Sequence, residues 1–321
     1  MSPPEGSSPD GGGAFLDPLP AAHDGPATLR VELPEPGRIG AQIHGLDVAT
    51  VTPSTAAEIR RLVYEHKAVV FTGQSLSTTE YIAFARALGE PQIYFQPNYH
   101  HPDHPEIFVS SNVPMNGKKV GVAGTGRYWH SDYQFFAEPL PLTMVSPQVT
   151  TDDGRSTCFI DMVQVLAGLP PHLAELVRGA RCLHEAKWRY KITPDDIDKS
   201  ITEILEEFGA ITPTVSHPAA IRHPVNGRES LYVSRGFTVG LEGRTPEDGR
   251  AALAELFDWI EREEHVQYQP WSTERILLWD NRQLIHSANL SDPSARSVNF
   301  RIGVYDDLPF YTNEPGARVV G

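Results

Sequence analysis

The sequence predicts a mainly β protein in which a β-sandwich or barrel core carries flanking helices. Many short apolar or alternating segments are separated by Gly, Pro, Asn and Asp, which is typical of strands joined by turns. Helical patterns are fewer and fall early in the chain or in segments that look inserted. We find no internal repeat and no second domain boundary, so the chain from residue 27 to 321 is expected to form a single domain.

Composition narrows the classes of partner. The 321 residues are 40% hydrophobic and 21% charged, with a formal net charge of −14. That charge argues against nucleic acid and against an anionic membrane surface, but it does not exclude a small anionic substrate. Only Cys158 and Cys182 are present, which is too few for a disulfide framework. No signal peptide and no apolar run of about 18 residues appears, so we expect a cytoplasmic protein.

The first part of the chain is predicted to hold a tail, three strands and two helices. Residues 1–26 are rich in Pro, Gly, Ser and Asp, and we expect them to be a disordered tail. Strand patterns follow at 28–33, 39–46 and 68–71. A capping-box pattern at 55–58 predicts one helix, and a second at 77–80 predicts another that ends at Gly89.

The middle of the chain is predicted to be a loop followed by strands. Residues 91–102 are dense in aromatic residues and prolines, and these line a pocket or simply pack. Strands are expected at 107–110, 142–149 and 156–160, and the turn signal at 151–154 predicts that the last two form a hairpin.

The remaining elements alternate between helices and strands. Residues 195–208 have a polar, helical pattern that predicts an exposed insertion over the core. The other patterns predict a helix at 163–177 broken by two prolines, a strand at 231–234, a helix at 246–265, and strands at 276–279, 283–286 and 298–305.

The segment 127–133 carries the first chemical signal. It places His130 and Asp132 two residues apart, so on a strand both side chains would point to one face. An imidazole and a carboxylate are two of the three ligands of a facial 2-His-1-carboxylate iron site. A lone His-x-Asp is weak, and the motif therefore predicts a distant histidine. His286, which follows a turn at 279–282 and has apolar neighbours, is the candidate.

These motifs together resemble the TauD/TfdA family of Fe(II)/2-oxoglutarate dioxygenases. The resemblance covers about residues 29 to 307 and rests on His130-x-Asp132, on Trp279-Asp-Asn-Arg followed by His286, and on a downstream arginine. It implies a double-stranded β-helix, or jelly roll, surrounded by helices. It also implies that His130, Asp132 and His286 are the iron ligands.

The implied chemistry explains the residue types. Three protein ligands leave three iron positions for 2-oxoglutarate and O₂. Decarboxylation of 2-oxoglutarate then yields succinate, CO₂ and an oxidant that abstracts hydrogen from the substrate. The family's halogenating members have Gly or Ala where this chain has Asp132, which argues against halogenation.

The resemblance also points to residues for the 2-oxoglutarate tail. Thr157 occupies the position of the family's keto-acid-binding threonine, and Arg155 is a candidate helper. The family's usual arginine falls where this chain has Ser297, beside Arg296. In an extended strand Arg301 shares the face of Ser297 while Arg296 points to the opposite one, so Arg301 is the better inward clamp. Whether Arg301 binds 2-oxoglutarate, substrate or both stays open.

A narrower resemblance concerns the substrate. The segments 126–135, 159–161, 189–192 and 232–240 look like the isonitrile-forming branch of the family. Those enzymes convert an N-carboxymethyl β-amino acid to an isonitrile with loss of CO₂, over two rounds of 2-oxoglutarate turnover. The branch positions that hold substrate carboxylate correspond to Lys191 and Tyr99, with Tyr94 beside them. Phe95 stands where a tyrosine is expected.

Three alternatives remain at this point. The nearest keeps the cofactors and hydroxylates another small acid, such as a sulfonate or an aryloxy or alkyl acid. A zinc hydrolase would also use two histidines and a carboxylate, but no glutamate is positioned as its general base. A non-catalytic acid-binding barrel is the third. The expected partner is a small anionic, amino-acid-derived substrate, and a homo-oligomer is compatible with the sequence.

Overall fold

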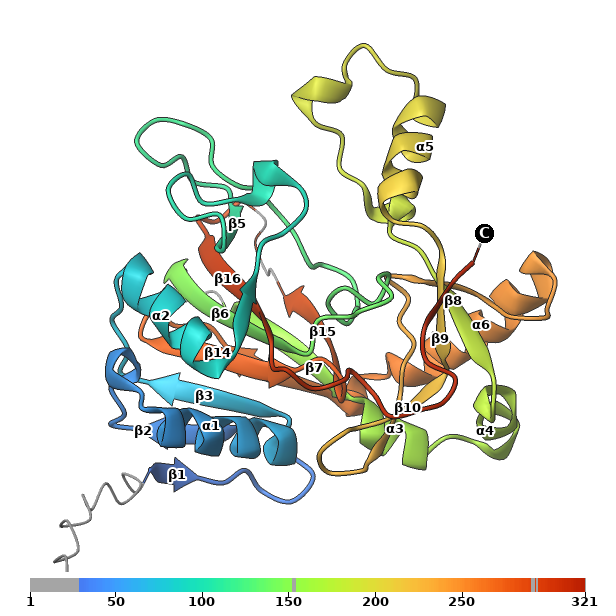
Figure 1. The fold of residues 1–321 in the computed structure, drawn as a ribbon, viewed down its shortest axis with the longest axis horizontal. Coiled ribbons are helices and arrows are strands. Elements are labelled where there is room, and N and C mark those ends of the chain that lie inside the picture. Colours follow the sequence, from blue (N-terminus) through green and yellow to red (C-terminus); the bar gives the residue numbers. More distant parts are fainter. Residues whose placement is uncertain (1–28, 152–153, 290–291, 293, 321) are drawn as a thin grey trace, which may run out of the picture.

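The computed structural model describes residues 29–151, 154–289, 292 and 294–320. The predicted tail at 1–26 lies outside these residues. The described chain is mainly β with flanking helices, as predicted (Figure 1). Within it, no helix combines the length and apolar character needed to cross a membrane.

The largest sheet has eight strands and is antiparallel except where β2 pairs with β3. In spatial order its strands are β1 (Arg30–Glu32), β2 (Ala41–His44), β3 (Ala68–Thr72), β14 (Arg275–Asp280), β6 (Leu142–Val149), β16 (Val298–Tyr305) and β4 (Glu90–Gln92), and β5 (Phe108–Ser111) also pairs with β16.

Three smaller sheets complete the β structure. The first consists of β13 (Val266–Pro270), β7 (Ser156–Asp161) and β15 (Leu284–Asn289). The second consists of β12 (Thr238–Leu241), β8 (Arg181–His184), β9 (Val215–Pro218) and β17 (Arg318–Val319), and the third of β10 (Ala220–Arg222) and β11 (Glu229–Leu231).

Helices surround these sheets. The α-helices are α1 (Pro53–His66), α2 (Thr78–Leu88), α3 (Met162–Ala167), α4 (Pro171–Val177), α5 (Ile201–Ile211) and α6 (Pro246–Ile260). Short 3₁₀ helices are η1 (Val48–Thr50), η2 (Pro97–Tyr99), η3 (Lys187–Arg189), η4 (Pro194–Asp196) and η5 (Glu263–His265).

The helix ends show which local signals were right. The capping box at Ser77 and Glu80 is present, and Gly89 closes α2 by donating its N–H to the Ala85 carbonyl. The capping box expected at 55–58 is wrong, because α1 starts earlier. Its N-cap is Thr52, and the following proline is pre-organised for the first helical position.

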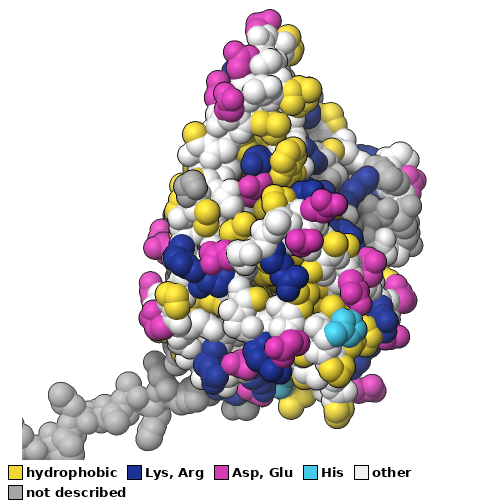
Figure 2. All heavy atoms as spheres, turned by 90° about the vertical axis from the view of Figure 1, so that its right-hand side faces the viewer, with side chains coloured by type: hydrophobic (Ala, Val, Ile, Leu, Met, Phe, Trp, Pro, Cys, Tyr) yellow, Lys and Arg dark blue, Asp and Glu magenta, His cyan; other side chains and the backbone are white. Residues whose placement is uncertain are grey.

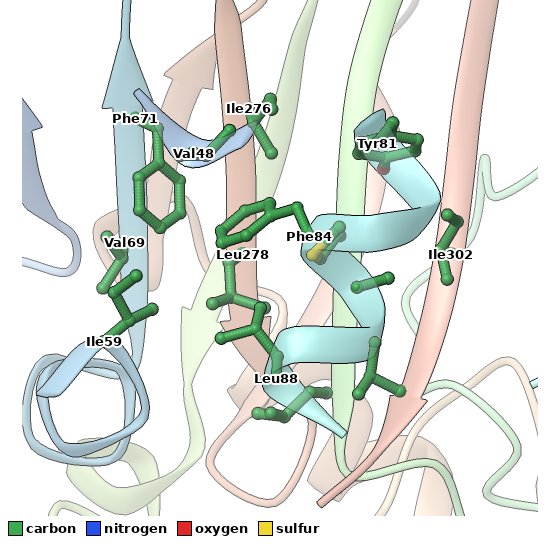
Figure 3. Close-up of a cluster of buried hydrophobic side chains, with 14 of the residues drawn as sticks. Val48, Ile59, Val69, Phe71, Tyr81, Phe84, Leu88, Ile276, Leu278 and Ile302 are labelled. Carbon is green, nitrogen blue, oxygen red and sulfur yellow. The ribbon is translucent and has the colours of Figure 1, made fainter. Parts of the chain in front are cut away.

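The two main sheets face each other across a shared core. Strand alternation sends Val69 and Phe71 of β3 toward α1 and α2, where they pack with Phe84 (Figure 3). The opposite face of the large sheet carries Trp279, which packs with Phe159 of the three-stranded sheet. The core therefore includes a layer between two sheets, with helices outside.

Two strand predictions need correction. β6 and β7 do not form the expected hairpin, because β6 belongs to the eight-stranded sheet and β7 to the three-stranded one. Part of the turn that suggested it, residues 152–153, lies outside the described residues. The strand expected at 231–234 ends at Leu231, and the loop at 91–102 contains part of β4 and all of η2.

Residues 187–212 form what we call the α5 arm, which includes η3, η4 and α5. The arm projects away from the sheets, as predicted for an exposed insertion (Figure 1). Hydrophobic and acidic side chains both lie on this projection (Figure 2), among them the exposed Ile197 and Ile201. The arm begins immediately after β8, which brings its base close to the core.

Candidate metal centre and substrate cavity

His130, Asp132 and His286 meet although the first two do not share a strand. His130 forms an isolated bridge with His286, whose backbone groups exchange hydrogen bonds of 3.0 and 2.8 Å. Asp132 opens a turn, and Tyr133 adopts a positive φ of 56°. The two side chains are thus brought together by a bridge followed by a turn rather than by strand alternation.

The three side chains form a compact donor set. One ligand atom from each lies within 4.8 Å of the others. Nε2 of His130 is 3.7 Å from Asp132 Oδ1, and Nε2 of His286 is 3.9 Å from Asp132 Oδ2. All three residues are buried, at 6%, 3% and 6% exposure in sequence order.

A hydrogen-bond chain holds the carboxylate of Asp132. The Thr143 hydroxyl donates to Asp132 Oδ2 over 2.6 Å, and it accepts from the side-chain amide of Asn281 over 2.8 Å. The carbonyl of that amide accepts from the indole of Trp279, at 2.9 Å, and from the backbone N–H of Asp132, at 3.4 Å. The Asn281 side chain therefore holds Asp132 at two points: at its backbone N–H directly, and at its carboxylate through Thr143.

The histidines are oriented toward the carboxylate. Nδ1 of His130 lies 2.8 Å from the Tyr128 carbonyl, which requires that nitrogen to be the donor and leaves Nε2 as a lone-pair acceptor. The ring of His286 packs 4.7 Å from Trp279. Among the described residues its Nδ1 has no hydrogen-bond partner.

The charges of this group suit a divalent metal. Burial lowers the pKa of His130, and burial with the adjacent His130 ring holds the pKa of His286 well below its usual value. Burial alone would raise the pKa of Asp132, but Arg301, the two histidines and the Thr143 hydroxyl lower it to about 2. At neutral pH the set is therefore two neutral imidazoles and one carboxylate, the form that coordinates metal.

Arg301 is the nearest cation. Strand alternation on β16 places Val298, Phe300 and Ile302 in the helix-facing core and turns Arg301 toward the metal site. Its guanidinium lies 2.6 Å from Asp132 Oδ1 and stacks 4.2 Å from the Phe108 ring.

A cavity opens beside the donor set. It encloses about 1110 Å³, part of it open to solvent, and Asp132 is the only acidic residue among those that line it. Five of the expected cofactor and substrate residues line this cavity: Tyr94, Tyr99, Thr157, Lys191 and Arg301.

The other expected cofactor residues lie elsewhere. Arg155 is buried and lines an adjoining hollow, together with Ser297 and Asn299, and its guanidinium donates to the Ala295 carbonyl at 3.0 Å. Arg296 precedes β16, is exposed and lines neither space. Asn299 belongs to both linings, so the two spaces adjoin.

Lys191 links the α5 arm to the loop that holds Ala123 and Gly124. Its ammonium donates to the carbonyls of Ala123 and Gly124, at 2.8 and 3.2 Å. Burial lowers the pKa of Lys191, and the nearby Arg127 adds to that effect. An anionic group entering the cavity would offer this ammonium a charged partner in place of neutral carbonyls.

Tyr94 and Tyr99 form an aromatic cluster with Phe108. Tyr94 meets Tyr99 at 5.0 Å between ring centroids, and Tyr99 stacks on Phe108 at 4.6 Å. Burial raises the pKa of Tyr99 to about 12, so its phenol is a neutral hydrogen-bond donor.

Sequence reasoning missed several lining or supporting residues. Thr143, Asn299 and Trp271 lie on strands or loops whose local sequence carries no special signal, and Trp271 donates to the Thr157 hydroxyl at 2.9 Å. Arg189 stacks 4.3 Å from the Tyr128 ring. Their roles arise from contacts between different segments of the fold, which no local motif encodes.

The donor set fits iron. Two imidazoles and one carboxylate on one side of a site, with space beside them, are the donors of non-haem Fe(II) oxygenases. The partly buried Arg301 guanidinium and the hydroxyl groups that line the same cavity suit a dicarboxylate such as 2-oxoglutarate.

Comparison with known families points the same way. The family model "Taurine catabolism dioxygenase TauD, TfdA family" matches residues 30–302. An alpha-ketoglutarate-dependent 2,4-dichlorophenoxyacetate dioxygenase of Cupriavidus pinatubonensis is 30% identical over 278 residues, which cover 83% of this chain and 94% of that protein. Pentalenolactone F synthase of Streptomyces arenae is 28% identical over 288 residues, or 85% and 95% of the two chains.

Solved structures share the fold. A taurine dioxygenase from Burkholderia xenovorans aligns with a TM-score of 0.71 at 24% identity, over 91% of this chain and 96% of its own. AAD-2, solved with Mn(II) and N-oxalylglycine, aligns with a TM-score of 0.71 at 22% identity, over 88% and 99%. At these identities the likeness concerns the fold alone.

Proposed function

This chain belongs to the TauD, TfdA family, and on that premise we propose that it converts an N-carboxymethyl β-amino acid to an isonitrile-bearing acid. As a member of the family it is an Fe(II)/2-oxoglutarate-dependent dioxygenase that uses O₂ and acts on a small organic acid. The zinc-hydrolase and non-catalytic alternatives fall with that finding.

His130, Asp132 and His286 are the iron ligands in this proposal. Support comes from their mutual distances and their burial. The hydrogen bond of His130 Nδ1 leaves His130 Nε2 free to face the carboxylate, and His286 Nε2 lies 3.9 Å from Asp132 Oδ2. Bound iron with 2-oxoglutarate and O₂ supplies an oxidant that removes hydrogen from a nearby C–H or N–H bond. Thr143 and Asn281 hold the ligating carboxylate in place throughout.

Thr157 and Arg301 bind 2-oxoglutarate in the proposal. Both line the cavity, Arg301 is a partly buried cation paired with the ligand Asp132, and Ser297, just before β16, carries no charge. Arg155 lies in the adjoining hollow, where a second guanidinium would assist a carboxylate that reaches past Asn299. Arg296 has no part in binding 2-oxoglutarate in this proposal, because it is exposed and lines neither the cavity nor the adjoining hollow.

Lys191, Tyr94 and Tyr99 bind the substrate's carboxylates, and Arg301 is shared between substrate and cosubstrate. The observation that carries this assignment is that Lys191 lines the same cavity as the iron ligands. A substrate with two carboxylates and an amine needs such cations and hydroxyls, because a buried charge without partners is costly.

The atoms balance over two turnovers. An R–NH–CH₂–COOH substrate reacts with two 2-oxoglutarate and two O₂. The products are R–N≡C, one CO₂ from the substrate, two succinate, two CO₂ from 2-oxoglutarate and two water. The substrate as a whole loses four electrons and four hydrogens, two of each in each turnover, and its own C–COO bond breaks to release CO₂.

We also propose that the β core is the double-stranded β-helix of the family. Support comes from the passage of consecutive strands between facing sheets, as β6 and β7 do, and from the packing of Trp279 against Phe159 between the two layers.

The second candidate is hydroxylation of another small acid. The relative that acts on 2,4-dichlorophenoxyacetate favours it, because that name describes an aryloxy acid and the cavity here is rich in aromatic side chains. Product analysis separates the two candidates.

The experiment incubates purified protein with Fe(II), 2-oxoglutarate and an N-carboxymethyl 3-aminoalkanoic acid, and follows products by mass spectrometry. We expect an isonitrile and two succinates per product. A final product that has gained one oxygen, with one succinate per product, would contradict isonitrile formation and favour hydroxylation.

A further inference from the structure

Part of the cavity lining is purely hydrocarbon. Phe135, Ala186, Phe208 and Phe237 all line the cavity and belong to one buried hydrophobic cluster. Their side chains contain no polar atom. We call these four residues the apolar wall.

The apolar wall begins beside a metal ligand. The Phe237 ring lies edge-on 5.9 Å from the ring of His130 and 4.7 Å from that of Phe135. A group in contact with Phe237 therefore lies close to the site of oxidation.

The wall also extends onto the α5 arm. Phe208, on α5, contacts Tyr190 at 4.8 Å and Phe95 at 5.8 Å between ring centroids. Neither Tyr190 nor Phe95 lines the cavity, so the Phe208 ring separates the cavity from them. Phe95 therefore affects the cavity through Phe208 rather than directly.

The wall limits what a substrate can place there. A polar group buried against these side chains would lose its hydrogen bonds to water and find no partner, whereas a hydrocarbon chain would be stabilised. The cations needed for carboxylates, Lys191 and Arg301, line other parts of the same cavity.

We propose that the apolar wall binds a hydrocarbon chain of the substrate and that Phe208 limits the length of that chain. The inference rests on the proposed function, in which this chain is the alkyl side chain of the β-amino acid. An acid with no such chain would leave the wall exposed to water.

The test measures binding without turnover. The full protein is loaded with Mn(II) and N-oxalylglycine, and calorimetry gives the affinity for N-carboxymethyl 3-aminoalkanoic acids of increasing chain length. Affinity is expected to rise about fourfold per added methylene, up to an optimum, and then to fall. Affinity that does not depend on chain length would overturn the proposal.

Two variants change the wall in opposite directions. Phe208→Ala should move the optimum to longer chains, because it opens the cavity toward Phe95 and Tyr190. Ala186→Leu should move it to shorter chains. Ile201→Ala, on the exposed side of the same helix, is the control and should leave the optimum unchanged.

Each of the two variants, Phe208→Ala and Ala186→Leu, tests the role of the apolar wall by itself, because each has its own predicted shift of the optimum chain length. If one fails to fold by thermal melting, the other still has a predicted direction, and Phe208→Leu is a milder substitute for the first. An optimum that stays at the wild-type length in every folded variant contradicts the role of Phe208 and Ala186.

The outcome is distinguishable from that of the proposed function. If turnover gives hydroxylated acids while affinity still follows chain length, isonitrile formation is wrong and the apolar wall stands. If isonitriles form equally well from all chain lengths and affinity is flat, the proposed function stands and the wall has no such role.

Discussion

The metal centre and the α5 arm lie on the same cavity but are built differently. The ligands sit between two sheets, each carboxylate oxygen of Asp132 has a partner, and strands from both layers meet there. The arm reaches the cavity through Lys191 and Phe208, while much of its length is exposed, including Ile197 and Ile201.

This difference suggests a division of roles, in which the sheets bind iron and 2-oxoglutarate and the arm contributes to substrate binding. In the proposed function the sheets hold the atoms that bind iron and 2-oxoglutarate, so changes there should affect every step of the reaction. The arm supplies two cations, Arg189 and Lys191, and the Phe208 ring to the cavity, so changes there should alter substrate binding and leave the iron site intact. The predictions below test that separation, beginning with the largest expected effect.

Asp132→Ala should abolish succinate formation. It removes the one anionic donor of the set, so Fe(II) would rest on two neutral imidazoles, and the Arg301 guanidinium beside them would lose its carboxylate partner. Succinate assays and metal analysis after dialysis check this. Asp258→Ala, at an exposed acid on α6, is the matched control and should retain iron and activity. Retained succinate formation in Asp132→Ala would show that the carboxylate ligand is elsewhere.

Thr143→Val should reduce iron affinity or turnover about 10- to 100-fold, the usual cost of losing a hydrogen bond to a metal ligand. The valine keeps the shape of the side chain and removes the donor to Asp132. Iron titration monitors affinity, and the substrate KM should stay near the wild-type value. Thr143→Ser restores the hydroxyl and should recover most of the loss; an equally damaged serine variant would point to packing instead.

Arg301→Lys should raise the KM for 2-oxoglutarate about tenfold or more, because a lysine cannot reproduce a bidentate contact with a carboxylate. Steady-state kinetics with varied 2-oxoglutarate measures the effect. Arg296→Lys is the control and should leave the KM unchanged, since that side chain is exposed. If only the substrate KM rose in Arg301→Lys, Arg301 would serve the substrate alone.

Lys191→Ala should raise the substrate KM about tenfold, the order expected for one charged hydrogen bond, and should uncouple succinate formation from substrate oxidation. The 2-oxoglutarate KM should not change. The ratio of succinate to oxidised product is the measurement. Lys199→Ala, on the outside of the same arm, provides the comparison. Unchanged substrate oxidation in Lys191→Ala would remove the best local support for the isonitrile assignment.

Local signals predicted the elements well where one residue decides the outcome. The Ser77 box and Gly89 fix α2 almost by themselves. The same logic failed at 55–58, because Pro53 gave α1 an earlier start. The hairpin expected between β6 and β7 failed for another reason: a turn signal specifies a reversal of the chain, but not which sheet the next strand joins.

The site shows the same division between features that the local sequence predicts and features that depend on contacts between segments. Residue identity and spacing indicated His130, Asp132 and His286, and alternation along one strand turned Arg301 inward. Thr143 could not be predicted, because its role depends on how β6 packs against the turn that holds Asp132. The role of Phe208 was not predicted either, because the polar, helical pattern of residues 195–208 indicated an exposed segment, whereas Phe208 is buried.

An anaerobic visible titration tests the separation of the two regions most directly. Fe(II) and 2-oxoglutarate are added to the wild-type protein, to Asp132→Ala and to Lys191→Ala, and the charge-transfer band of the keto acid on Fe(II) is followed. We predict no band in Asp132→Ala, and in Lys191→Ala a band that saturates at the wild-type concentration of 2-oxoglutarate. A band that persists in Asp132→Ala, or disappears in Lys191→Ala, would contradict the account.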